Sequence, residues 1–282
     1  MRAMVLGAAG LLGHDLVATA PPDMTLFPFP RADLDITDTE ALAATVREVR
    51  PDVVINAAAY TAVDRAESEA DAAFRVNGAA VGELGRIARE AGARVIHFST
   101  DYVFDGTSAE PYTEESPPNP LNVYGASKLA GETALRASGA PCLIVRTQWL
   151  FGAHGRCFPR TMWERATARS SSRVVSDQVG HPTCSVDLAR ATWSLCEREV
   201  AGVIHVANAG VATWYDVARR VYAAGGAARL VQPCSTAQFP TPARRPARAV
   251  LGIARSEQAL GGPLRPWEEA IDRFLAEIEV RP

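Results

Sequence analysis

Three residues, Thr100, Tyr124 and Lys128, have the types and spacing that could protonate a carbonyl oxygen. Tyr124 and Lys128 are four residues apart in a helical pattern, so their side chains share one face. A lysine ammonium beside a phenol favours the phenolate, and we expect it to bring the pKa of Tyr124 towards the working pH. Thr100 follows a strand-like run, and its hydroxyl could hold the same oxygen. The competing interpretation is a surface tyrosine and lysine on an ordinary helix.

A glycine-rich turn near the N-terminus could hold the dinucleotide that such chemistry uses. Gly7, Gly10 and Gly13 follow a short apolar run and open a helical pattern, which is the usual setting of a pyrophosphate site. The spacing GxxGxxG resembles that of the extended short-chain dehydrogenase/reductase superfamily. The competing interpretation is a glycine turn without a ligand. Three further residues of the turn, Ala9, Leu11 and Leu12, are expected at the cofactor.

Charge near the end of the second expected strand indicates which cofactor binds. Arg31 could accommodate a 2′-phosphate, as expected for NADP, although a solvated arginine fits equally well. Asp35 and Ile36 could flank the adenine. We therefore predict NADPH as the cofactor, with NADH tolerated because no residue visibly excludes it.

A small-residue segment after the third expected strand could complete the cofactor site. Ala57, Ala58 and Ala59 leave room for an adenine or ribose against the backbone, although a well-packed helix start explains them equally well. Tyr60 follows directly. Ser99, Tyr124 and Lys128 are also expected to contact the cofactor, and Lys128 could hydrogen-bond the nicotinamide ribose.

Candidate substrate contacts cluster where strands are expected to end. Asp101 and Tyr102 continue the chain beyond Thr100, and Trp149 follows the fifth expected strand. Trp149 could instead be a core residue. Arg245, with Arg244 and Arg248 beside it, could grip a substrate diphosphate, and solvated loop arginines are the alternative.

Composition excludes several classes of function. A hydrophobic fraction of 48% and a net charge of -3 are typical of a globular protein without a polyanion-binding surface, so nucleic acid is not expected as a partner. No apolar run approaches the roughly 18 residues of a membrane span, and residues 1–4 lead into a strand and not a signal peptide. Five scattered cysteines without CxxC spacing argue against disulfides and zinc, and favour the cytoplasm.

The order of apolar patterns predicts an α/β fold of the Rossmann type, a doubly wound parallel sheet with a smaller C-terminal substrate-binding lobe. We place the dinucleotide-binding domain at residues 1–150 and the lobe at 151–282, which could lend elements back to the main sheet. Strands are expected at residues 3–6, 24–29, 52–56, 94–99 and 142–146, with helices at 11–20, 39–49, 68–91 and 122–138. In the second half we expect helices at 158–167, 186–199, 214–224 and 267–278, strands at 203–206 and 230–232, and a proline-punctuated loop at 239–246.

At this level of detail the chain resembles the dTDP-4-dehydrorhamnose reductase family. The matching segments span residues 56–67, 99–106, 120–132, 146–149, 177–183 and 240–246, and STDYVFDG with LNVYGASKLAGE are the most specific. The resemblance implies reduction of the 4-keto group of dTDP-6-deoxy-L-lyxo-4-hexulose to dTDP-L-rhamnose. It also implies catalysis by Thr100, Tyr124 and Lys128, and substrate contacts from Thr100, Asp101, Tyr102 and Trp149.

Two positions depart from the pattern of the family. Some members dimerise through a magnesium site on acidic residues; here Asp15 is present, but Val186 stands where a second acidic ligand would align. We therefore expect no metal site, and a monomer or weak homodimer. Ala249 also stands where we expected a small polar residue.

Other functions of the same fold fit less well. Dehydratases of the superfamily use Thr-Asp-Glu, and Tyr102 in the third place cannot be that base. An epimerase would need an acid/base pair near the sugar, and no Cys/His pair is placed for it. Two alternatives stay open: a non-catalytic NADP-binding regulatory subunit, like that of methionine adenosyltransferase, and a reductase of another nucleotide 4-keto-6-deoxy sugar.

Overall fold

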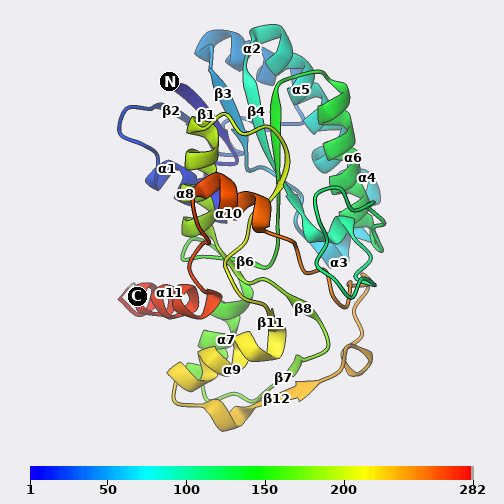
Figure 1. The fold of residues 1–282 in the computed structure, drawn as a ribbon, viewed down its shortest axis with the longest axis vertical. Coiled ribbons are helices and arrows are strands. Elements are labelled where there is room, and N and C mark those ends of the chain that lie inside the picture. The colour runs from blue at the N-terminus through cyan, green and yellow to red at the C-terminus, as the bar shows by residue number, and fades with distance from the viewer. Residues whose placement is uncertain (281–282) are drawn as a thin grey trace.

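The computed structural model describes residues 1–280, and a six-stranded parallel sheet forms the centre of the molecule (Figure 1). Every neighbouring pair of strands in the sheet is parallel. Helices cover both faces, so the predicted Rossmann-like doubly wound fold is confirmed. In spatial order the strands are β10 (Gly202–His205), β5 (Cys142–Thr147), β4 (Arg94–Thr100), β3 (Val53–Asn56), β1 (Arg2–Leu6) and β2 (Thr25–Phe29).

The two faces of the sheet carry separate apolar cores because successive strand residues point to opposite sides. In β1, Ala3 and Val5 pack against one helical layer, whereas Met4 and Leu6 pack against the other. All four are fully buried, as expected for a parallel strand covered on both faces. The first layer is α1 (Leu11–Ala18) and α8 (Ser185–Glu197), with α10 (Ala254–Leu260) beside them; the second is α2 (Thr39–Val49), α5 (Ala80–Ala91) and α6 (Val123–Ala137).

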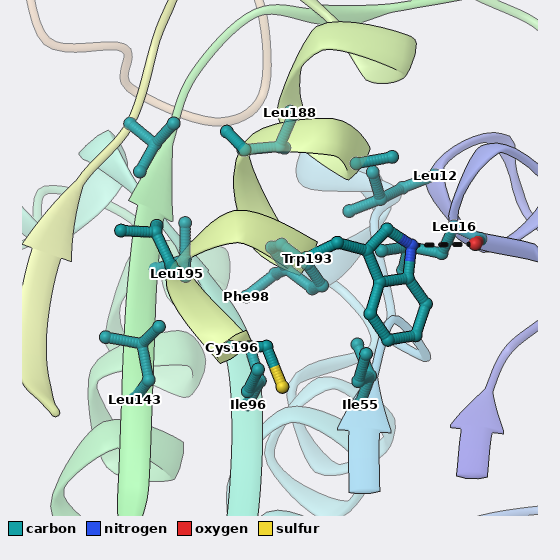
Figure 2. Close-up of a cluster of buried hydrophobic side chains, with 14 of the residues drawn as sticks. Leu12, Leu16, Ile55, Ile96, Phe98, Leu143, Leu188, Trp193, Leu195 and Cys196 are labelled. Carbon is teal, nitrogen blue, oxygen red and sulfur yellow. Dashed lines mark hydrogen bonds between the residues drawn. The ribbon is translucent and has the colours of Figure 1, made fainter. Parts of the chain in front are cut away.

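One of these cores joins the first and second halves of the chain (Figure 2). The ring of Trp193 in α8 packs with Leu12 and Leu16 of α1, and its indole Nε1 donates to the Leu16 carbonyl at 3.0 Å. A buried tryptophan contributes a large apolar area, and a satisfied N–H removes the cost of burying its polar atom. The contact fixes α1, the helix that follows the glycine turn, against α8.

The remaining elements of the second half form a smaller lobe with its own core. Phe151, Tyr222 and Phe274 are buried at its centre. Its helices are α7 (Phe158–Thr167), α9 (Trp214–Ala224) and α11 (Trp267–Val280). Its short strands pair as β6 (Leu150–Phe151) with β9 (Thr183–Cys184), β7 (Ser172–Val175) with β12 (Val231–Cys234), and β8 (Val179–Gly180) with β11 (Ala212–Thr213).

The two parts of the molecule in space do not correspond to the two halves of the sequence. Strand β10 pairs with β5, and α8 packs on α1, so these two elements of the second half lie with the first 150 residues. The boundary after residue 150 stays a prediction. Segment 239–246 forms neither helix nor strand, as predicted, and within residues 1–280 no helix is both long and apolar enough to cross a membrane. The short helices are α3 (Val63–Ala66), η2 (Asp101–Val103), η3 (Ala228–Leu230) and η4 (Thr236–Gln238).

The helical segment predicted over residues 68–91 is present from Ala70 to Ala91, but it contains a π-helical turn that was not predicted. The structure divides this segment into α4 (Ala70–Phe74), a π-helical turn η1 (Arg75–Ala79) and α5. Apolar periodicity does not reveal such a turn, because a π-turn inserts one residue into a pattern that is otherwise helical on both sides.

The π-helical turn orients a buried asparagine. The side chain of Asn77 accepts from the Tyr60 backbone N–H at 2.9 Å and donates to the Tyr60 carbonyl at 2.9 Å. It also donates to Ser127 Oγ of α6 at 3.0 Å. Asn77 therefore fastens the segment after β3 to α6.

A buried ion pair anchors α6 to the sheet. Glu132 is fully buried, and Arg146 of β5 donates to it with two nitrogens, at 2.9 Å (Nε to Oε1) and 2.6 Å (Nη2 to Oε2). Ser99 Oγ of β4 donates to the same Oε1 at 2.5 Å. Tyr124 and Lys128 lie on the same face of α6, so this pair holds them at β4.

We expect Arg146→Met to lower the free energy of unfolding by about 3–5 kcal/mol, because it leaves a buried carboxylate without its partner. Urea denaturation at neutral pH measures the loss. The control is Arg86→Met, which breaks a solvent-exposed pair with Glu83 and should cost less than about 1 kcal/mol. Equal losses in the two variants would contradict the anchoring role.

Candidate active site

A cavity of about 210 Å³ opens where the glycine turn, the end of β2 and the segment after β3 meet. In a parallel sheet the carboxyl ends of these strands lie on one edge, and the N-terminus of α1 adds backbone N–H groups suited to phosphate. Leu34 and Val76 also line the cavity, and sequence reasoning missed both. The predicted cofactor residues that line it are Gly7, Ala9, Gly10, Arg31, Asp35, Ile36, Ala57, Ala58, Ala59 and Tyr60.

Three predicted residues of the turn do not line this cavity. A Cβ on Gly13 would lie 2.1 Å from the carbonyl oxygen of Gly7, so glycine is needed there for close packing. Leu12 is buried in the core between α1 and the sheet. Leu11 lies beside Gly152, at the start of the C-terminal lobe. Their contacts with a cofactor stay predictions.

Arg31 is placed at the cavity and reaches into solvent. Its side chain is 83% exposed, and its Nε lies 3.1 Å from Asp35 Oδ2. Hydrogen bonds from Thr37, and the nearby Arg31, hold the pKa of Asp35 below its usual value. The guanidinium is therefore oriented by Asp35 while most of its surface stays open to a ligand.

The predicted catalytic hydroxyls meet at the carboxyl end of β4. Thr100 Oγ1 donates to Asp101 Oδ1 at 3.0 Å and accepts from the Tyr102 N–H at 3.2 Å, and the same hydroxyl acts on the pKa of the Tyr124 phenol. Asn122 caps the N-terminus of α6, and its side chain accepts from the Gly125 N–H at 2.8 Å. A Cβ on Gly125 would lie 2.1 Å from the Tyr102 carbonyl oxygen, so glycine there lets α6 approach η2 closely.

The expected lowering of the pKa of Tyr124 is wrong. Burial raises the pKa of Tyr124 to about 12, and the charge of Asp101 adds to this effect, while the hydrogen bond with Thr100 opposes it. The tyrosine is therefore a protonated phenol at neutral pH. Burial likewise raises the pKa of Tyr102, whose ring meets that of Tyr124 edge to face at 5.7 Å.

Lys128 is buried and bonded to β4. Its Nζ donates to the Phe98 carbonyl at 2.6 Å and lies 3.3 Å from His97 Nε2. Burial lowers the pKa of Lys128 to about 8, and the charge of Glu132 opposes this shift. Ser99, predicted at the cofactor, uses its hydroxyl to bond Glu132 and does not line the cavity.

Asp101 is the second titratable group beside Thr100. Gln148 Nε2 donates to its Oδ2 at 3.0 Å and also to the Ala249 carbonyl at 3.1 Å. Burial raises the pKa of Asp101 to about 7, although hydrogen bonds from Thr100 and Gln148 act in the other direction. Ala249, where a polar side chain was expected, thus contributes through its backbone.

A second cavity, of about 840 Å³, lies in the C-terminal lobe and reaches Asp64 of α3. Trp149 does not line it, but its ring stacks at 3.8 Å on Trp214, which does. The φ angle of Trp149 is +47°, an unfavourable conformation for a bulky residue. The stack on Trp214 holds Trp149 between the end of β5 and this cavity, despite the unfavourable backbone conformation.

Arg245 lines the large cavity and is not a solvated loop arginine. Its Nη1 and Nη2 each lie 2.9 Å from one carboxylate oxygen of Asp64, and this bond lowers the pKa of Asp64. Arg244 is exposed, and Arg248 donates to the Ala109 carbonyl at 3.2 Å.

Three side chains near the start of α1 come close enough to share an ion. His14, Asp15 and His154 have ligand atoms within 4.8 Å of one another. The two imidazoles stack at 3.2 Å, and Asp15 accepts from Ser185, the residue before Val186. The predicted absence of a metal site stays a prediction.

Sequence reasoning missed the residues that support the catalytic set from elsewhere in the chain. Gln148 and Gln178 lie inside segments that match the family, but only tertiary structure shows that Gln148 bonds Asp101 and that Gln178 accepts from Trp214 Nε1 at 3.2 Å. His97 and Asn77 have no sequence signal beyond a polar residue in an otherwise buried pattern.

The raised pKa of Asp101 predicts a pH-dependent stability. Because the folded-state pKa is about 7 and the unfolded value is about 3.9, the native state binds this proton more tightly. The contribution to the free energy of unfolding is therefore greatest below pH ~4 and is lost as the pH rises towards 7, by up to about 1.4 kcal/mol per unit.

Asp101→Asn should flatten this part of the stability curve relative to wild type, as measured by urea denaturation across this pH range. Asp71→Asn, on the exposed face of α4, controls for the loss of a surface carboxylate. Parallel curves for wild type and Asp101→Asn would show that Asp101 does not hold a proton in the native state.

Comparison with known proteins identifies the family. A model described as "RmlD substrate binding domain" matches residues 1–280. A dTDP-4-dehydrorhamnose reductase of Burkholderia thailandensis is 40% identical over 295 residues, covering 99% of each chain. A dTDP-4-keto-6-deoxy-D-glucose reductase of Streptomyces niveus is 41% identical over 273 residues, covering 96% of this chain and 95% of that protein.

Comparison with solved structures indicates the same family as the sequence comparison. The crystal structure of the Bacillus anthracis dTDP-4-dehydrorhamnose reductase, in complex with NADP, matches with a TM-score of 0.93 at 36% identity, over 98% of this chain and 99% of that chain. Sequence and structure thus place this chain in the dTDP-4-dehydrorhamnose reductase family of the extended short-chain dehydrogenase/reductase superfamily.

Proposed function

We propose that this protein uses NADPH to reduce the 4-keto group of dTDP-6-deoxy-L-lyxo-4-hexulose, giving dTDP-L-rhamnose. The observation that carries the proposal is the approach of the Tyr124 phenol on α6 to the Thr100 hydroxyl at the end of β4, which acts on the pKa of that phenol. It lies at the end of β4, on the same edge of the sheet as the glycine turn after β1. The names of the relatives supply the sugar.

The residues of the chain fit proton delivery to a ketone. When bound, the nicotinamide supplies hydride to the carbonyl carbon. The Thr100 hydroxyl holds the carbonyl oxygen, and Tyr124 transfers its phenolic proton to that oxygen as negative charge develops there. A pKa of about 12 suits this role, because the phenol stays protonated until it meets an alkoxide, which is far more basic than a phenolate.

After this transfer the phenolate needs a compensating charge. Lys128 lies one helical turn beyond Tyr124 on the same face of α6, and its ammonium form favours the phenolate. We also propose that Lys128 holds the nicotinamide ribose. A Lewis acid is not required in this scheme, because two hydroxyls already bind the oxygen.

The two cavities suit the two ligands. The smaller, alanine-lined cavity with Arg31 at its mouth fits the adenosine half of NADP. The larger cavity has aromatic, amide and guanidinium groups from Trp214, Gln178 and Arg245, which suits a nucleotide sugar. Because Asp64 already pairs with Arg245, we propose that substrate phosphate competes with this carboxylate for the guanidinium.

The sugar is the part of the proposal that most needs a test. The Streptomyces niveus relative acts on a different dTDP-4-keto sugar by its name and is 41% identical, so a reductase of another nucleotide 4-keto-6-deoxy sugar is the second candidate. NADPH oxidation with a panel of such sugars, followed by NMR determination of the new C4 configuration, separates the two. Preference for a substrate other than the lyxo-4-hexulose would reject the first candidate.

Tyr124→Phe keeps the ring and removes the proton, so we expect kcat to fall roughly 10²- to 10⁴-fold while cofactor affinity is unchanged. Steady-state kinetics and NADPH titration measure the two quantities. Tyr215→Phe, at a partly buried tyrosine packed against the core of the C-terminal lobe, is the matched control and should keep normal turnover. Near-normal kcat in Tyr124→Phe would refute the assignment of the proton donor.

Arg31→Ala tests the choice of cofactor. If Arg31 binds the 2′-phosphate, the ratio of kcat/KM for NADPH over NADH should fall on the order of ten- to a hundredfold, the value of one charge-assisted hydrogen bond. Arg47→Ala, an exposed arginine of α2, controls for the loss of one positive charge. An unchanged ratio in Arg31→Ala means that another group recognises the phosphate.

A further inference from the structure

A chain of three buried polar side chains runs from the end of β3 to α6. Asn56 Nδ2 lies 3.1 Å from His97 Nδ1, and His97 Nε2 lies 3.3 Å from Lys128 Nζ. Asn56, His97 and Lys128 are 1%, 0% and 2% exposed, so water does not substitute for these contacts. Each polar atom of these three side chains must therefore find its hydrogen-bond donor or acceptor among neighbouring protein groups.

The asparagine fixes which nitrogen of the imidazole carries the proton. Asn56 Oδ1 accepts from the Ala58 N–H at 3.1 Å, so the amide must present Nδ2, a donor, to His97 Nδ1. Burial and the charge of Lys128 hold the pKa of His97 well below its usual value, so the ring is neutral. A neutral ring that accepts at Nδ1 carries its hydrogen on Nε2.

This tautomer presents an N–H group to the lysine. An ammonium has three donors and no acceptor, and Nζ already donates to the Phe98 carbonyl at 2.6 Å. When Lys128 is charged, its ammonium therefore faces the Nε2–H of His97, and neither group can accept a hydrogen bond from the other. A neutral amine has a lone pair, which can accept from Nε2–H while Nζ still donates to Phe98.

We propose that His97, held in its Nε2–H tautomer by Asn56, is a positioning residue that disfavours the ammonium form of Lys128 and so sets the pH at which this lysine gains its charge. Burial by itself lowers the pKa of Lys128, to about 8, and the opposing Nε2–H of His97 acts on the lysine in the same direction. The asparagine thus acts on the lysine through the imidazole, without touching it.

Other charged groups near Lys128 do not replace this control. Glu132, one turn further along α6, favours the ammonium, but Arg146 of β5 already binds both of its oxygens. Asp101 of η2 and Tyr124 of α6 lie at the substrate end. Among the residues the structure describes, no carboxylate lies within 4.0 Å of Nζ.

The consequence for turnover rests on the proposed function. If ammonium stabilises the Tyr124 phenolate, kcat should decline above the pKa of Lys128, near pH 8. Removing the opposing N–H should move this decline to higher pH without removing the proton donor.

The direct test is NMR of the intact protein, because Lys128 is the only lysine in the sequence. Protein labelled with [ε-¹³C]lysine gives one side-chain signal, whose titration reports the pKa of Lys128 without assignment. ¹⁵N-labelled histidine reports the tautomer of each of five rings, and the signal lost in His97→Gln identifies His97. We expect a neutral Nε2–H ring and a lysine that titrates near pH 8.

Two variants remove the opposing N–H in different ways. In His97→Gln the amide oxygen can accept from both neighbours, and in Asn56→Asp the carboxylate accepts from Nδ1–H and reverses the tautomer. Both should raise the pKa of Lys128 by about one unit or more and shift the alkaline limb of kcat equally. His181→Gln, a buried histidine bonded to the Gly210 and Leu251 carbonyls, should leave the lysine signal unchanged.

The outcomes separate this proposal from the proposed function. A wild-type lysine that titrates near its ordinary value of about 10.4, or a His97 ring that is protonated or carries hydrogen on Nδ1, would overturn the proposal. So would a lysine pKa unmoved in both variants. If the NMR results are as expected but no 4-keto sugar is reduced, the proposed function fails and the control of Lys128 by His97 stands.

Discussion

The ion pair between Glu132 and Arg146 is the interaction on which the active site depends. Isolated charges of this kind cannot be buried cheaply, so each requires the other at hydrogen-bond distance. Because Glu132 lies on the face of α6 that carries Lys128 and Tyr124, satisfying the carboxylate also sets the distance and rotation of the helix relative to β4 and β5. The placement of Tyr124, the proposed proton donor, is thus coupled to the stability of the core.

Much of the fold follows from local pattern. The five strands of the first half each contain a short apolar run, and helical patterns lie between them, so their order alone indicates a doubly wound sheet. The π-helical turn around Asn77 was not predictable, because its cause is the hydrogen bonding of that side chain to Tyr60 and Ser127. Two-residue strands such as β6 and β9 have no period to detect and exist only through their pairing.

The candidate site also has a part that local sequence predicts and a part that it does not. Gly7, Thr100, Tyr124 and Lys128 could be selected from spacing because each sits at a strand end or one helical turn from the next. Their protonation states could not, because these depend on burial and on partners distant in the sequence: Gln148 for Asp101, and the β4 backbone with its histidine for the lysine. Spacing therefore selected the candidate reacting groups, which stay a prediction, but misjudged the acidity of the Tyr124 phenol.

The position of β10 at the edge of the sheet has a consequence for synthesis of the chain. Until residues 202–205 emerge from the ribosome, the outer edge of β5 has no strand to pair with, and its N–H and C=O groups are flanked by apolar side chains. In a nascent or proteolytic fragment that ends near residue 150, the outer edge of β5 therefore has unpaired backbone groups that can pair with another chain. The same fragment lacks α8, which covers one apolar face of the sheet. The sheet edge at β5 and the apolar face under α8 in the first 150 residues are therefore covered only after α8 and β10 have been made.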